Sequence, residues 1–159
     1  VAGDWVGPTG MLVDGVLDTG DAPATHPGAS VLEAEGLTTL VGLHGPGGYL
    51  VLVGPVAALW PQVAALTPGV AIVAVNPGAT VKDEPGISVL RGGRLPIKSR
   101  SMRGVVLGRP FADDPHWIGE AGRVVLPGLR IVGEGGNPPA ELIDLLASAG
   151  GVWVGTKRR

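Results

Sequence analysis

The segment Tyr49–Leu66, YLVLVGPVAALWPQVAAL, sets the tightest limit on what this chain can fold into. Five residues typical of a buried strand run directly into an apolar helical segment, and the turn between them holds a single glycine, Gly54. Pro55 suits the first turn of that helix, because the N–H that proline lacks would have no partner there. The segment therefore predicts a strand–turn–helix unit of an α/β protein.

The same turn is where an α/β protein would bind a nucleotide-derived cofactor. Such sites use several glycines, which let the backbone approach the ligand and leave helix N-terminal amides exposed. Here Gly54 is followed by Pro55, Val56, Ala57 and Ala58, which add side chains and remove one donor. The segment keeps the scaffold of such a site and lacks most of its glycines.

Apolar runs and turn-rich or helical segments continue to alternate along the chain. The expected strands are 49–53, 70–75, 87–92, 104–108, 129–135 and 152–158, and the expected helices are 55–66, 112–125 and 138–150. Residues 76–86 replace one helix by a turn-rich crossover. This pattern predicts an open, mainly parallel, twisted α/β sheet with helices on both faces, rather than a barrel.

The first 48 residues are less regular, and we expect a turn-rich extension before a core at 49–159, within one compact domain. Met11–Leu17 alternates like a short strand, and 38–44 has the composition of another. Ser30, with Glu33 three residues later, forms a capping-box pattern for a short helix that Gly36 would end.

Composition excludes several classes of protein. The chain has no cysteine, which excludes disulfides, thiolate metal sites and a cysteine nucleophile. No apolar run reaches the roughly 20 residues of a membrane span, and no basic-then-apolar leader opens the sequence. We therefore expect a cytoplasmic protein that does not enter the membrane. His26 and His44 form no ligand spacing with His116, so no metal site is predicted.

Charge is unevenly distributed. No Lys or Arg precedes Lys82, whereas six acidic residues do. From Lys82 onward the chain has twelve basic and eight acidic residues. Five of the bases form a run between two expected strands, and we expect this run to lie near the carboxyl ends of the sheet: Arg91, Arg94, Lys98, Arg100 and Arg103. The acidic N-terminal part and this basic run predict contact within one chain or a homo-oligomer, with solvated faces as the alternative. The run could also bind an anionic small molecule, but no aromatic residues interleave it, which argues against nucleic acid.

From Tyr49 to Arg158 the order of segments resembles the class I S-adenosylmethionine-dependent methyltransferases, which have a Rossmann-like sheet. The resemblance is carried by three stretches: GGRLPIKSRSMRGVVLGRPF, WIGEAGRVVLPGLRIVGEG and AELIDLLASAGGVWVGTKR. Their Leu95-Pro96 and Pro127-Gly128 turns are its more specific features. The resemblance implies a shortened Rossmann-like methyltransferase fold and, for an active member, S-adenosylmethionine as the cofactor.

The departures fall on the positions that would bind this cofactor. In the family the first strand ends with an acid and a three-glycine loop, where this chain has Leu52, Gly54, Val56 and Ala58. Asn76 replaces the acid that holds the ribose hydroxyls, and an amide lacks the two charged acceptors of a carboxylate. The two remaining acid positions hold Gly93 and Arg103. Gly54, Asn76 and Gly93 are thus the cofactor-binding positions that the resemblance implies.

Three residues after the fourth core strand are candidates for catalysis: Asp113, Asp114 and His116. A carboxylate beside a histidine can act as a general base, but Asp before Pro is also a common helix N-cap, and we favour the cap. Glu134 follows the fifth strand, at the same sheet edge. Trp60 and Trp117 flank the expected cleft, where they either fill it or belong to the core.

Three functions are compatible with these residues. The leading hypothesis is a methyltransferase-like protein that has lost its cofactor, so that none binds, and that acts through binding or self-association. The second is an S-adenosylmethionine-dependent methyltransferase with an atypical cofactor loop. The third is a protein that binds another anionic small molecule at the basic sheet edge.

Overall fold

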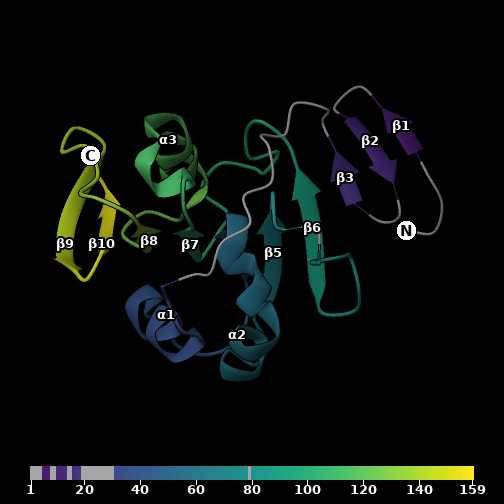
Figure 1. Ribbon diagram of the computed structural model, residues 1–159, viewed down its shortest axis with the longest axis horizontal. Coiled ribbons are helices and arrows are strands. Elements are labelled where there is room, and N and C mark those ends of the chain that lie inside the picture. Colours follow the sequence, from purple (N-terminus) through teal and green to yellow (C-terminus); the bar gives the residue numbers. More distant parts are fainter. Residues whose placement is uncertain (1–4, 8–9, 14–15, 19–30, 79) are drawn as a thin grey trace.

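A computed structural model describes residues 5–7, 10–13, 16–18, 31–78 and 80–159. Ten strands form one sheet in the order β1-β2-β3-β6-β5-β4-β7-β8-β10-β9 (Figure 1). Their bounds are β1 Trp5–Gly7, β2 Gly10–Val13, β3 Val16–Asp18, β4 Tyr49–Val53, β5 Ala71–Val75, β6 Ile87–Arg91, β7 Gly104–Leu107, β8 Arg130–Glu134, β9 Ile143–Ala149 and β10 Val152–Lys157.

The centre of the sheet is parallel. Strands β6, β5, β4, β7 and β8 run in one direction, and β10 runs antiparallel to both β8 and β9. After β4, the next two strands along the chain, β5 and β6, are added on one side of it, and the following two, β7 and β8, on its other side. The strand order therefore reverses between β4 and β7, which places a topological switch point there.

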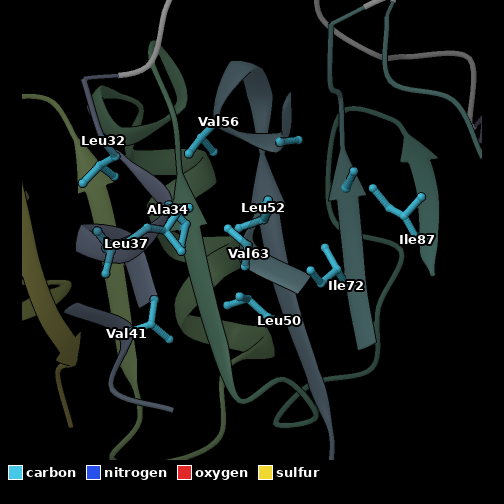
Figure 2. Packing of buried hydrophobic residues seen from close by; sticks show 14 of the residues in the cluster. Leu32, Ala34, Leu37, Val41, Leu50, Leu52, Val56, Val63, Ile72 and Ile87 are labelled. Atoms are coloured by element: carbon cyan, nitrogen blue, oxygen red, sulfur yellow. The ribbon is translucent and has the colours of Figure 1, made fainter. Parts of the chain in front are cut away.

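Helices cover both faces of this sheet. Helices α1 (Ala34–Val41) and α2 (Trp60–Leu66) lie on one face, and α3 (Pro115–Val124) lies on the other (Figure 1). Side chains of α1 and α2 pack on the strands in the cluster that Figure 2 shows, which we call the α1–α2 cluster. The cluster beneath α3 includes Trp117, Ile118 and Trp153. The predicted open, mainly parallel α/β sheet with helices on both faces is confirmed.

The helix predicted at 138–150 is wrong, because residues 143–149 form strand β9. The apolar spacing there fits a helix, yet Ile143 is the only buried residue of the strand. Two prolines, Pro138 and Pro139, are followed by the β9–β10 hairpin, and its ladder outweighs the local helical preference.

Three predictions for the N-terminal part are also wrong. Residues 38–41 belong to α1 rather than to a strand, and that helix ends at Gly42, in the left-handed conformation, rather than at Gly36. Its N-cap is Glu33, which makes no side-chain cap, and Ser30 lies outside the described residues. Instead of one strand over 11–17, there are two, β2 and β3, which pair antiparallel.

We expect α1 to unfold together with the sheet, because Leu37 is fully buried in the α1–α2 cluster. Leu37→Ala should lower the free energy of unfolding by about 2 to 5 kcal/mol in one cooperative denaturant transition. Leu66→Ala is the matched control; Leu66 is 46% exposed at the end of α2, and its loss should cost under about 1 kcal/mol. Equal effects of the two changes would contradict this packing.

Candidate functional site

The carboxyl ends of β4 and β7 are the place where an open α/β sheet would hold a ligand, because the strand order reverses between them. The connection from β7 to α3 crosses this place. Gly108 N donates to Val53 O at 2.8 Å, and a Cβ on Gly108 would come within 2.9 Å of the same oxygen. The connection therefore lies directly on the end of β4.

Gly54, the one glycine of the turn after β4, is buried beneath an aromatic ring. Its φ of 83° favours glycine, and a Cβ there would lie 2.7 Å from the ring of Phe111. Phe111 is itself buried and makes an edge-to-face contact with Trp117, with ring centroids 5.0 Å apart. The side chain of Phe111 thus covers the turn that a cofactor would approach.

Phe111 was missed in the sequence, although it is the only phenylalanine of the chain and follows a strand at the expected edge. The two tryptophans considered for filling the cleft lie in the cores instead. Trp117 is buried in the cluster beneath α3, and Trp60 packs against the α1–α2 cluster.

Asn76, at the end of β5, uses both halves of its side-chain amide on one backbone unit. Its Nδ2 donates to Gly92 O at 2.8 Å, and its Oδ1 accepts from Gly92 N at 2.9 Å. The residue is 6% exposed and has a φ of 48°, a left-handed conformation that asparagine tolerates. The amide therefore ties the end of β5 to the residue after β6, where a carboxylate could not donate to the Gly92 carbonyl.

Gly93 is engaged by His116. The Nε2 of His116 lies 2.6 Å from Gly93 O, and because a carbonyl only accepts, Nε2 carries the proton in this bond. His116 belongs to the first turn of α3, so the bond links that helix to the loop after β6. The structure thus brings together one predicted catalytic residue and one predicted cofactor position.

The two aspartates have separate structural roles. Asp114 is the N-cap of α3 and accepts from the N–H of His116 at 2.9 Å, which confirms the cap that we favoured. Asp113 accepts from Gly136 N at 3.0 Å and so ties the start of α3 to the loop after β8. Glu134, at the end of β8, is 1% exposed and accepts from Val31 N at 3.3 Å.

Glu120 and Arg123 of α3 form a clamp on the loop after β6, which sequence reasoning did not single out. Glu120 accepts from Leu95 N at 2.9 Å and from two nitrogens of Arg123 at 2.8 and 3.0 Å. Arg123 donates in turn to Leu95 O, Ile97 O and Ser99 Oγ. Their i, i+3 spacing on a helix is the one signal that could have indicated the pair.

The clamp shifts the pKa of both partners. Burial opposes ionisation of the Glu120 carboxyl, but hydrogen bonds from Arg123 and Leu95, with the charges of Arg123 and His116, outweigh it and lower the pKa of Glu120. The hydrogen bond to Glu120 likewise raises the pKa of Arg123. Both groups are therefore charged at neutral pH, and the loop they hold is fixed by charge-assisted bonds.

The basic run does not lie along one edge of the sheet. Arg91, at the carboxyl end of β6, donates to Pro77 O at 3.1 Å, whereas Arg94, Lys98 and Arg100 are exposed. Arg103 precedes β7 and lies at the amino edge, where it donates to the carbonyls of His44, Gly45 and Gly47. The expectation that all five bases gather near the carboxyl ends is therefore wrong for Arg103.

Two features are absent from the part of the chain that the structure describes. There, no group of three or more histidine, cysteine, aspartate or glutamate side chains is arranged to hold a metal ion. Every helix in this part is too short or too polar to cross a membrane.

Comparison with known proteins identifies the fold. No protein-family profile matches the sequence, and no curated protein matches it. Among solved structures, a SAM-dependent methyltransferase from Aquifex aeolicus is similar, with a TM-score of 0.54 and 14% identity, over 77% of this chain and 87% of that one.

Geranyl diphosphate C-methyltransferase from Streptomyces coelicolor A3(2), solved with Mg²⁺, geranyl diphosphate and S-adenosyl-L-homocysteine, is also similar, with a TM-score of 0.53 and 17% identity. The match covers 63% of this chain and 43% of that enzyme, so the chain spans less than half of its length. The resemblance to class I methyltransferases is thereby confirmed at the level of the fold, which is the Rossmann-like methyltransferase fold.

We expect Asn76→Asp to destabilise the protein by about 1 to 3 kcal/mol, because the new carboxylate would face the Gly92 carbonyl without a proton to donate. Chemical denaturation at neutral pH measures this loss. Asn137→Asp is the matched control, since the exposed Asn137 Oδ1 accepts from Ser148 Oγ and a carboxylate would accept equally well. A loss no greater than that of the control would contradict the proposed role of the amide.

Stability should depend on pH through Glu120. The pKa of Glu120 is lower in the folded protein than in the unfolded chain, where it is about 4.3. The ionised carboxylate therefore contributes its full share to the free energy of unfolding above that unfolded-state pKa, and this contribution is lost as the pH falls through the folded-state pKa. Glu120→Gln should therefore destabilise the protein more at neutral pH than near pH ~3. Denaturation at both pH values checks this, with Glu141→Gln as the exposed control, and a penalty independent of pH would argue against the clamp.

Proposed function

We propose that this protein has kept the methyltransferase-like fold, has lost the binding of S-adenosylmethionine, and acts non-catalytically through binding or self-association. The observation that carries the proposal is the Asn76 amide. Its nitrogen donates to Gly92 O and its oxygen accepts from Gly92 N, so the side chain at the family's ribose-binding position is hydrogen-bonded to the backbone. A ligand that took the place of Gly92 as the partner of this amide would have to break both bonds, at a cost of roughly 1 kcal/mol each.

Two further contacts at the same edge support this proposal. The ring of Phe111 covers Gly54, and a cofactor that approached this turn would have to displace a buried aromatic side chain. Gly93 O accepts from His116, and the loop beyond it is held by Glu120 and Arg123. All three positions that the family resemblance implies for the cofactor are thus engaged by other parts of the chain.

The non-catalytic proposal also agrees with the roles of the catalytic candidates. Asp114 caps α3, Asp113 holds the loop after β8, and the Nε2–H of His116 is donated to a carbonyl. A general base needs a lone pair directed at the substrate proton. The favoured roles of these side chains are therefore structural.

Self-association through opposite charges is the partner proposal that follows from the sequence. Arg94, Lys98 and Arg100 are the exposed members of the basic run and would meet the acidic N-terminal part of a second chain. Side chains before Val31 lie outside the described residues, so this proposal rests on charge alone. Association of this kind should weaken as salt is raised, because exposed charges are screened.

The test is thermal unfolding with and without S-adenosylmethionine or S-adenosyl-L-homocysteine. We expect no shift in Tm at millimolar ligand. Saturation at about 100 times Kd would stabilise a real site by about 2.7 kcal/mol, or roughly 5 to 10 °C for a chain of this size. A methyltransferase of known activity serves as the positive control. Such a shift would favour the alternative of a methyltransferase with an atypical loop, and a shift with phosphate-bearing ligands alone would favour an anion-binding protein.

A further inference from the structure

Strand β9 is the most exposed of the helices and strands whose side-chain burial the structure describes. It ends the sheet beyond β10, on the side opposite β1 to β3 (Figure 1). Six of its seven residues are exposed, and Leu145 and Leu146 are 46% and 55% exposed. The connection from β8 to β9, residues 135–142, forms no helix that could cover the strand.

The sequence of β9 does not protect this edge. Natural sheets guard their edges with lysine, proline or charged side chains, since an outer row of N–H and C=O groups can pair with another strand. In IDLLASA the only charge is Asp144, which lies 4.0 Å from Arg158, and the segment 145–149 has none. Within 145–149 a bulge at Leu146 is the one guarding feature, and the ladder to β10 is regular again from Ala147 to Ala149.

We infer that the outer edge of β9 pairs with β9 of a second copy of this chain, antiparallel and centred on Ala147. The segment 145–149 has no charge, so it gives no electrostatic attraction to an acidic or a basic peptide. A second copy needs no such attraction, because a two-fold axis pairs each strand with an identical antiparallel strand. In this register Asp144 faces Gly150 of the second copy, so like charges do not meet. A register centred on Asp144 would oppose the two carboxylates and is disfavoured.

The small area of this edge indicates a weak pair. Five paired residues span about 17 Å, and with a layer about 10 Å thick they cover roughly 170 Å² on each copy. Stable interfaces bury more than about 1,000 Å² in total, so edge pairing with the two leucines gives a weak, concentration-dependent dimer. The β9 edge is a surface for self-association distinct from the charge-based one, and the inference stands whether or not a cofactor binds.

Sedimentation velocity from micromolar to millimolar protein tests it. We expect the wild-type weight-average mass to rise towards twice the monomer mass, and Leu146→Lys to abolish the rise. Leu66→Lys, at a leucine of α2 that is 46% exposed against 55% for Leu146, should behave as wild type. An unchanged circular dichroism spectrum and Tm show that each variant is folded. A wild-type monomer throughout, or association of Leu146→Lys, would overturn the inference.

Two further measurements separate this surface from the charge-based one. High salt should leave a β9 dimer intact, and dissociation by salt would count against it. Because the chain has no cysteine, Ala147→Cys provides a single thiol that should form a disulfide dimer under mild oxidation, since residues opposite each other across the axis lie within disulfide reach. Ala65→Cys, on α2, is the matched control, and equal crosslinking of the two variants would overturn the pairing.

Discussion

Strand β4 is hydrogen-bonded on both sides and buried on both faces, and this arrangement constrains everything around it. Its neighbours β5 and β7 are parallel to it, so each must be reached by a connection that returns across the sheet. Four of its five residues are buried, so both faces need a covering layer. Helices α1 and α2 supply one layer, and α3 with the loop after β6 supplies the other.

The same strand explains why the carboxyl edge is so fully connected. In a parallel sheet every loop that follows a strand emerges at one edge, where unpaired backbone groups need partners. In this chain the partners are groups of the chain itself. Asn76 Nδ2 donates to Gly92 O, Gly108 N donates to Val53 O, and His116 Nε2 donates to Gly93 O. An edge that satisfies its own backbone leaves few groups for a ligand, which is the physical basis of the proposed loss of cofactor binding.

Sequence reasoning located the central strands because continuous apolar runs of this length leave little choice of structure. It also identified the cap at Asp114, because an aspartate before a proline is a local signal. It failed at β9, where the helical spacing of leucines is overridden by pairing with β10. It could not place Phe111 over Gly54 or Arg123 over the loop after β6, because these contacts join residues that are far apart in the sequence.

The contacts of Arg103 limit which substitutions this chain can accept during evolution. Its guanidinium donates hydrogen bonds to three carbonyls of the loop 44–48, and Gly48 packs against the aliphatic part of its side chain. No other side chain offers as many donors in one fixed plane. The arginine and the glycine-rich loop can therefore be replaced only together, and related chains should either keep both or have lost both.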